Sequence, residues 1–161
     1  FDNIKKRNPI YLKDVISHLE PIQHNNSSKR DILHRAKELN EINFKRIKAT
    51  PLNGGLRSAW SEELRLPCHK VKESFHDNYG RLAWDKLSST ITTKFNQYYS
   101  GRFGHPEQDR ALSLREGALI QTFPKDYQFF GTDYQIARQI GNAVPVNLSK
   151  AVGETFISAI V

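Results

Sequence analysis

The segment from Arg110 to Pro124 constrains the fold more than any other part of the chain. Ser113 stands three residues before Glu116, the spacing at which each side chain can bond a free backbone N–H at the start of a helix. Apolar residues then recur at helical spacing, and the proline ends the pattern because it cannot continue a helix. A second segment, Gln139-Ile-Gly-Asn-Ala-Val-Pro145, predicts a tight Gly-Asn turn that leads into a new helix, with the proline at its first position.

Three more stretches have helical periodicity. Residues 10–20 and 29–44 each carry apolar residues on one face, which predicts two short amphipathic helices. The C-terminal helix beginning at Pro145 carries a third apolar stripe. The stripe residues, in chain order, are Leu12, Val15, Ile16 and Leu19, then Ile32, Leu33, Ala36 and Leu39, then Leu148, Val152, Phe156 and Ile160.

The middle of the chain predicts β-structure and loops. Ser89–Phe95 is rich in β-branched residues with rough alternation, which favours a strand. Thr50–Gly55 contains Asn-Gly-Gly and predicts a tight turn, because these residues adopt positive φ at low cost. The predicted fold class is therefore α+β, with helices at both ends of a small, loop-rich β region.

Composition points to one globular domain with a basic surface. The chain has 161 residues, enough for its own core, and a net charge of +7. Residues 1–100 carry 18 Lys and Arg against 11 Asp and Glu, whereas residues 101–161 carry six of each. Lys and Arg can neutralise DNA phosphates, so we expect a DNA-contacting surface in the first 100 residues. Solvated lysines on an ordinary basic protein are the alternative.

The single cysteine excludes an internal disulfide framework and fits a reducing cytoplasm. No apolar run approaches the roughly 20 residues needed to span a membrane. The sequence therefore predicts a soluble, intracellular protein with no membrane partner. The six histidines have no zinc-type spacing, and no His/Asn/His cluster of an HNH nuclease is recognisable, so no metal site is expected.

Two adjacent blocks resemble a known family. HPEQDRALSLREGALIQTFPKDYQF (residues 105–129) and QIGNAVPVNLSKAVGETF (residues 139–156) are similar to motifs IX and X of bacterial DNA (cytosine-5) methyltransferases. In that family motif IX reads His-Pro…Arg…Ser/Thr-x-Arg-Glu…Gln-x-Phe-Pro, and motif X reads Gln-x-Gly-Asn-x-Val-Pro. The resemblance is strong over residues 79–156 and loose over residues 1–78.

The resemblance implies a function and assigns roles. The complete enzyme flips a cytosine out of the duplex, adds a cysteine thiolate to its carbon 6, and methylates carbon 5 with S-adenosyl-L-methionine. Motif IX organises the target-recognition domain and motif X lines the cofactor pocket. Cofactor contacts are thus expected at Asn142, Ala143 and Val144, and a structural role at Arg110, Arg115 and Glu116. From their loops we expect DNA contacts at Arg57, Arg81, Lys94 and Arg102. Thr90-Ile91 resembles the threonine–aliphatic pair of these recognition domains, which implies DNA contacts there as well.

The family's N-terminal blocks are absent. There is no glycine-rich cofactor loop and no Pro-Cys-Gln nucleophile loop, because Pro67-Cys68 is followed by His69. Cys68 is therefore interpreted as a structural free cysteine, no catalytic residue is assigned, and the chain alone is expected to be inactive. With no methionine either, it is most simply a C-terminal piece whose partner is the absent catalytic domain.

The division expected is a helical lead-in from the catalytic domain (1–44), a target-recognition region with motif IX (45–130), and motif X with a C-terminal helix that belongs to the Rossmann-like methyltransferase domain (131–161). The function expected is target recognition in a restriction-modification methyltransferase, bound to double-stranded DNA in a bacterial cytoplasm. A stand-alone sequence-specific DNA-binding module and the small subunit of a split enzyme remain the alternatives.

Overall fold

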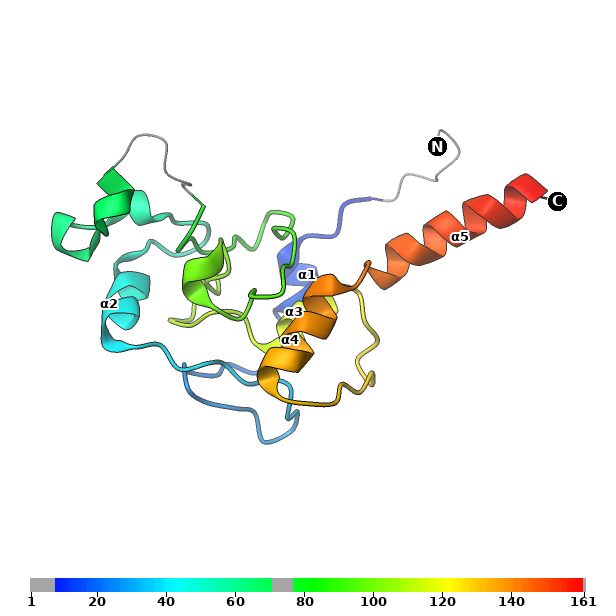
Figure 1. Cartoon of the computed structure of the whole chain (residues 1–161), viewed down its shortest axis with the longest axis horizontal. Coiled ribbons are helices and arrows are strands. Elements are labelled where there is room, and N and C mark those ends of the chain that lie inside the picture. Colours follow the sequence, from blue (N-terminus) through cyan, green and yellow to red (C-terminus); the bar gives the residue numbers. More distant parts are fainter. Residues whose placement is uncertain (1–7, 71–76, 161) are drawn as a thin grey trace.

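The structure is a computed structural model that describes residues 8–70 and 77–160. Helices and single 3-10 turns make up its regular structure (Figure 1). The elements are α1 (Leu12–Ile16), α2 (Glu41–Ala49), η1 (Arg57–Ala59), η2 (Glu62–Leu64), η3 (Pro67–Lys70), η4 (Tyr98–Ser100), α3 (Leu114–Ile120), α4 (Asp133–Asn142) and α5 (Val146–Ile160). No described helix is long and apolar enough to cross a membrane.

The expected small sheet is not found among the described residues. Their β-pairing consists of isolated bridges, which join Ser27 to Arg35 and Gly104 to both Arg81 and Ala111. The α+β class is therefore not supported: the central region is a set of irregular loops held by side chains. The Asn53-Gly54 turn is confirmed, with φ of 52° and 99°.

The main core lies where α1, α3 and α4 meet. Leu12 and Ile16 of α1, Leu114 of α3, and Ile136 and Ile140 of α4 are all almost fully buried in one apolar cluster. The helix expected at residues 10–20 is confirmed over Leu12–Ile16. Because these helices come from both ends of the chain, the core joins the lead-in segment to the two blocks that resemble motifs IX and X.

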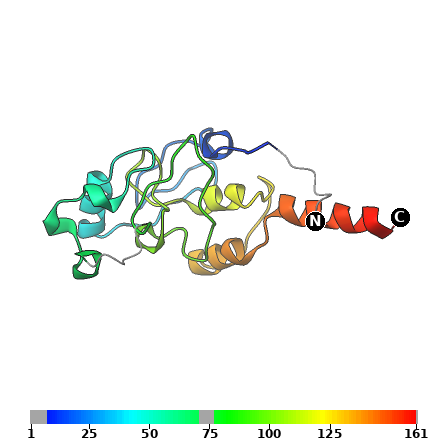
Figure 2. The same ribbon diagram turned by 90° about the horizontal axis from the view of Figure 1, so that it is seen from above.

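A second apolar cluster surrounds α2, at the end of the molecule opposite α5 (Figures 1 and 2). Ile47 of α2 is fully buried, and the rings of Trp60 and Tyr79 meet edge to face with centroids 5.2 Å apart. The guanidinium of Arg46 lies 5.5 Å from the Trp60 ring centre and 5.4 Å from that of Tyr79. This arrangement places a buried cation against aromatic faces.

The helix predicted for residues 29–44 is wrong, because most of that segment folds back on itself. The N–H of Ser28 donates to the carbonyl of His34 at 2.8 Å. Leu33 enters the main core while Ile32 stays 78% exposed. The next helix, α2, starts only at Glu41, where the Asn40 side chain accepts the N–H of Asn43 at 3.0 Å. Long-range packing of Leu33 thus overrides the local helical pattern.

The strand predicted at Ser89–Phe95 is also wrong, since its end turns sharply where Phe95 N–H donates to Thr92 O at 3.1 Å. This turn is wedged between α3 and α4 at two glycines. A Cβ added at Gly117 would lie 2.1 Å from the Phe95 ring, and one at Gly141 would lie 2.4 Å from the backbone of Thr92 and Thr93. The β-branched segment therefore packs closely against α3 and α4 at these two glycines instead of pairing with a strand.

The capping box predicted at Ser113 is confirmed. Its hydroxyl accepts the N–H of Glu116 at 3.1 Å, and the Glu116 carboxylate accepts the N–H of Ser113 at 2.7 Å. The tight turn predicted at Gly141-Asn142 is wrong, because both residues belong to the last turn of α4, a helix not anticipated from the sequence. The change of direction comes at Ala143–Pro145.

The C-terminal helix is confirmed as α5, which projects away from the body in two perpendicular views (Figures 1 and 2). None of its described side chains is buried. Its largest apolar residues stay mostly exposed, with Phe156 at 63% and Ile160 at 84%. α5 is therefore a helix with exposed apolar side chains that extends from a packed body.

Candidate functional site

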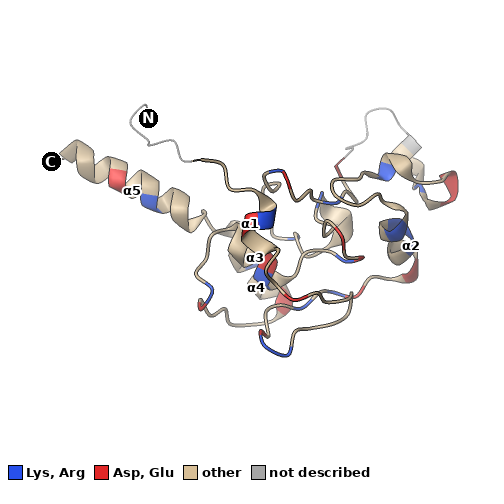
Figure 3. Cartoon of the chain, turned by 180° about the vertical axis from the view of Figure 1, so that it is seen from behind, with Lys and Arg blue, Asp and Glu red and all other residues tan. Residues whose placement is uncertain are grey.

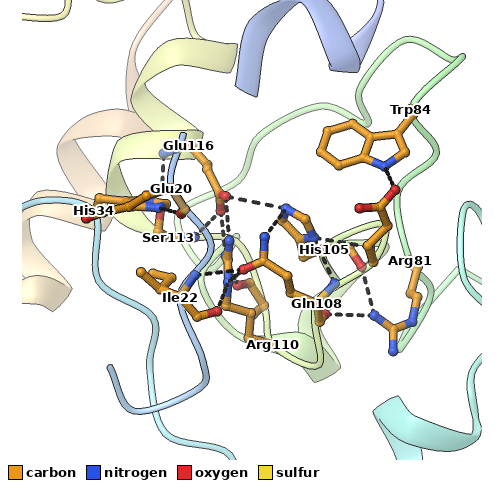
Figure 4. Close-up of polar contacts among 12 residues, drawn as sticks. Glu20, Ile22, His34, Arg81, Trp84, His105, Gln108, Arg110, Ser113 and Glu116 are labelled. Atoms are coloured by element: carbon orange, nitrogen blue, oxygen red, sulfur yellow. Dashed lines mark hydrogen bonds and ion pairs between the residues drawn. The ribbon is translucent and has the colours of Figure 1, made fainter. Parts of the chain in front are cut away.

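A buried ion pair organises the segment from His105 to Glu116 (Figure 4). The Arg110 guanidinium donates two parallel hydrogen bonds to the Glu116 carboxylate, both 2.7 Å long, and neither side chain is more than 1% exposed. Burial by itself would raise the pKa of Glu116, but the Arg110 charge and hydrogen bonds lower that pKa to about 2. The carboxylate therefore stays ionised inside the core.

His105 lies beside this pair as a neutral ring. Its Nδ1 accepts the backbone N–H groups of Glu107 and Gln108 at 3.1 and 3.0 Å. Burial, with the nearby arginine charges, lowers the pKa of His105 to about 3, although the Glu116 carboxylate 3.7 Å away acts in the opposite direction. His105 thus shapes the backbone of the loop and is not available as a proton carrier near neutral pH.

Arg81, expected to contact DNA, is fully buried. Its guanidinium donates to the carbonyls of Thr50, Ile47, His105 and Gln108 at 2.7–3.1 Å and pairs with Asp109 at 2.5 Å. With every guanidinium nitrogen bonded inside the protein, this side chain has no donor left for a base or phosphate. The DNA-contact assignment of Arg81 is corrected to a structural one.

Arg115 connects α3 to the lead-in segment. Its Nε donates to the Asp31 carboxylate at 2.5 Å, and its backbone N–H donates to the Leu33 carbonyl at 3.0 Å. Burial would raise the pKa of Asp31, but hydrogen bonds from Arg115 and Leu33 lower it on balance. Arg110, Arg115 and Glu116 thus all lie inside the body, where the two arginines bond Ile22 and Asp31 of the distant lead-in segment.

A basic cavity of about 270 Å³ lies beside Arg57, an expected DNA contact that is itself only 7% exposed, at the α2 end of the molecule. Its lining residues are Leu56, Arg57, Ser58, Arg65 and His69. Burial lowers the pKa of His69, and the charges of Arg57, Arg46 and Arg65 lower it further. The arginines that line the cavity favour an anion there, although Arg65 is also paired with Glu62 at 2.8 Å and donates to the Ser58 carbonyl at 3.1 Å. Sequence reasoning had not selected Arg65 or His69.

The other expected DNA contacts lie in separate surroundings. Thr90 and Lys94 are exposed, whereas Ile91 is only 5% exposed and belongs to the main core. The burial of Ile91 corrects its assignment as a DNA contact. Arg102 is partly exposed and pairs with Asp77. Lys and Arg are interspersed with Asp and Glu along the described ribbon (Figure 3).

The expected cofactor residues lie at the corner between α4 and α5. Asn142 ends α4 and is exposed, Ala143 is its C-cap, and Val144 is 60% exposed. An open groove of about 540 Å³ runs beside this corner. Its lining residues are Phe130, Gly131, Gln135, Arg138, Gln139 and Asn142. Four of these recur at i, i+3, i+4 and i+7 along α4, a spacing that marks one helical face.

The remaining candidates take no part in these surfaces. Cys68 is exposed on η3 and is not among the residues that line either cavity. Among the described residues, no group of three or more His, Cys, Asp or Glu side chains could hold a metal ion.

Comparison with known proteins gives a consistent result. A family model described as C-5 cytosine-specific DNA methylase matches residues 2–158. Type II methylase M.HgiDII of Herpetosiphon aurantiacus is 46% identical over 153 residues, which cover 89% of this chain and 42% of that protein. DNA (cytosine-5)-methyltransferase 1 of Mus musculus is 50% identical over 76 residues, 47% of this chain and 5% of that protein. Type II methyltransferase M.PspPI of Psychrobacter is 49% identical over 77 residues, 48% of this chain and 18% of its own length. The chain thus spans less than half the length of these curated relatives.

Proposed function

Because the chain belongs to the family of C-5 cytosine-specific DNA methylases, we propose that it is the target-recognition and C-terminal portion of a DNA (cytosine-5) methyltransferase. The similarity to a bacterial type II methylase over 89% of the chain carries this proposal. It further suggests a restriction-modification enzyme that acts on DNA in a bacterial cytoplasm. The chain recognises duplex DNA and forms one wall of the cofactor site, while the rest of the enzyme supplies the nucleophile.

The basic cavity supports the DNA-binding role. The charges of Arg57 and Arg65 attract an anion such as a backbone phosphate to this cavity, although Arg57 is only 7% exposed and Arg65 already pairs with Glu62 at 2.8 Å. Arginine is well suited to phosphate because its guanidinium donates in a planar fork. Phosphate contacts of this kind set the register on DNA, whereas base contacts give specificity. Thr90, Lys94 and Arg102 remain proposed contacts on the neighbouring loops.

The corner after α4 fits a cofactor wall but not a complete pocket. Asn142 offers an exposed amide and Val144 an exposed apolar surface, next to an open groove. An amide can bond polar groups of S-adenosyl-L-methionine and an apolar side chain can cover its rings. When bound, this cofactor supplies the methyl group. Asn142, Ala143 and Val144 would hold it from one side only, since α5 and the groove are open to solvent.

The bare face of α5 supports the proposed partnership with an absent catalytic domain. Phe156, Ile157 and Ile160 are each more than 60% exposed, and apolar surface gathered on one helix usually marks an interface. We propose that this helix packs on the catalytic domain. Replacing Phe156 and Ile160 by Ser should leave the folding of the isolated chain unchanged but prevent its assembly with the remaining methylase segment.

Two measurements test the function. The isolated chain should bind duplex DNA with affinity that falls steeply with salt; binding that ignores salt, or none, would contradict a phosphate-contacting surface. The chain combined with the remaining methylase segment should methylate carbon 5 of cytosine, read by bisulfite sequencing, while the chain alone should not. Tight binding to one sequence by the chain alone, with no methyl transfer in any combination, would favour the stand-alone DNA-binding module.

A further inference from the structure

One side chain bonds the corner on which the proposed cofactor residues lie. Gln121 follows α3 as its C-cap and is only 6% exposed. Its Nε2 donates to the carbonyls of Ile140 and Ala143, at 3.0 and 3.1 Å. These carbonyls lie on either side of Asn142 along the chain, so the amide bonds the backbone two residues before that residue and one residue after it.

The backbone around Gln121 also holds the start of α5. Its carbonyl accepts the N–H of Val146 at 3.3 Å, and the hydroxyl of Thr122 accepts the N–H of Asn147 at 3.0 Å. The first N–H groups of a helix have no partner within the helix, so these bonds satisfy donors that would otherwise need water. Thr122 adopts a φ of +61°, in the left-handed region that a β-branched residue rarely occupies.

α4 does not need Gln121 to stay on the body, because Ile136, Ala137 and Ile140 are buried in the core. By contrast, α5 has no buried side chain of its own. Loss of the Gln121 amide should therefore loosen the residues from Asn142 to Asn147 while the body remains folded.

We infer that Gln121 is a positioning residue for the cofactor wall: it holds the corner from Asn142 to Val144 in a binding-competent shape and thereby connects α3 to the cofactor site. The inference rests on the proposed function, because it assumes that this corner contacts the cofactor. It assigns Gln121 no contact with the cofactor itself.

The first test uses the isolated chain and hydrogen exchange. Gln121→Leu keeps the side-chain size but cannot donate, so the hydrogen-bonded amides of Ala143, Val146 and Asn147 should exchange about tenfold faster, as expected when a buried pair of hydrogen bonds is lost. Amides of α3 should keep their protection. Gln128→Leu, the same change at an exposed position, is the matched control. Unchanged exchange at the corner in Gln121→Leu would overturn the inference.

The second test measures cofactor affinity by calorimetry in the complete methyltransferase. Gln121→Leu should weaken S-adenosyl-L-methionine binding about tenfold, with less than twofold change in DNA affinity, whereas Gln128→Leu should change neither. Gln121→Glu adds a signature that a general loss of stability does not produce. Its protonated carboxyl can donate to one carbonyl, but the ionised form places negative charge against both. Cofactor affinity should therefore recover as pH falls.

The Asn142→Asp variant distinguishes failure of the proposed cofactor role of the corner from failure of the positioning role of Gln121. If Asn142→Asp leaves cofactor affinity unchanged, the proposed cofactor role of the corner is wrong. If Asn142→Asp weakens cofactor binding and Gln121→Leu does not, only the positioning role of Gln121 is wrong. Weakening by both variants, with pH-dependent recovery in Gln121→Glu, is the result expected.

Discussion

Arg110 and Glu116 face each other through two parallel hydrogen bonds of 2.7 Å, and both side chains are almost completely buried. Removing one charge of such a pair leaves the other buried and uncompensated, whereas removing both does not. Stable folding of the segment from His105 to Glu116 therefore depends on having both residues of the pair.

Glu116→Gln should destabilise the isolated chain by about 3–5 kcal/mol in urea denaturation, because the Arg110 charge remains buried without its counter-ion. Arg110→Met combined with Glu116→Leu should recover part of that loss. Glu154→Gln on exposed α5 is the control: its partner Lys150 lies 3.8 Å away on the surface, and the midpoint should not change. Equal midpoints for Glu116→Gln and Glu154→Gln would contradict a stabilising buried pair.

The free energy of unfolding should fall in acid, and His105 should cause the loss that begins as pH falls below about 6.5. The pKa of His105 is about 3 in the folded chain, against 6.5 ordinarily. Between these values the unfolded chain binds a proton that the folded chain does not, so stability is lost as pH falls from about 6.5 toward 3. Glu116, at about 2 against 4.5, adds a loss of the same sign below about pH 4.5.

His105→Asn keeps an acceptor for the two backbone N–H groups but does not titrate. The urea midpoint of this variant should depend less on pH between 6.5 and 4.5 than that of the parent chain. A parallel pH dependence in the two proteins would show that His105 is not the group responsible.

Gly141→Ala should destabilise the chain by about 1–3 kcal/mol, because the new methyl group would meet the backbone of Thr92 and Thr93, which cannot rotate away. The matched control is Gly153→Ala on α5, where a Cβ has nothing within 4 Å. That change should be neutral or stabilise the helix by up to about 1 kcal/mol. Thermal unfolding of both variants measures the difference, and similar losses would contradict the close packing.

Arg65→Gln should weaken binding of the isolated chain to all duplex sequences about equally and reduce the slope of log affinity against log salt by about 0.9, the loss of one phosphate contact. Lys125→Gln removes the same charge from the loop between α3 and α4 and should leave that slope unchanged. The two slopes come from titrations at several salt concentrations. A smaller slope in Lys125→Gln alone would move the DNA surface away from the cavity.

Local chemistry determined the parts of this protein that depend on near neighbours. The α3 capping box needs only Ser113 and Glu116 three residues apart, and α5 needs only its helical pattern after Pro145, so both were predictable. The same holds for the turn at Asn53. The resemblance to the family came from the order and spacing of residues in 105–156, which can be compared without a structure.

Tertiary structure decided what long-range contacts control. The residues of Ser89–Phe95 favour a strand locally, but a strand needs a partner strand. Gly117 and Gly141 lack side chains and instead leave room for this segment to pack between α3 and α4. Arg81 looks like any basic loop residue in the sequence, yet carbonyls from two distant segments, residues 47–50 and 105–108, enclose it. Gln121 likewise acquires its bonds only when α3 meets the corner after α4. Burial and hydrogen bonding between distant segments cannot be read from spacing along the chain, because spacing does not record which backbone groups come together.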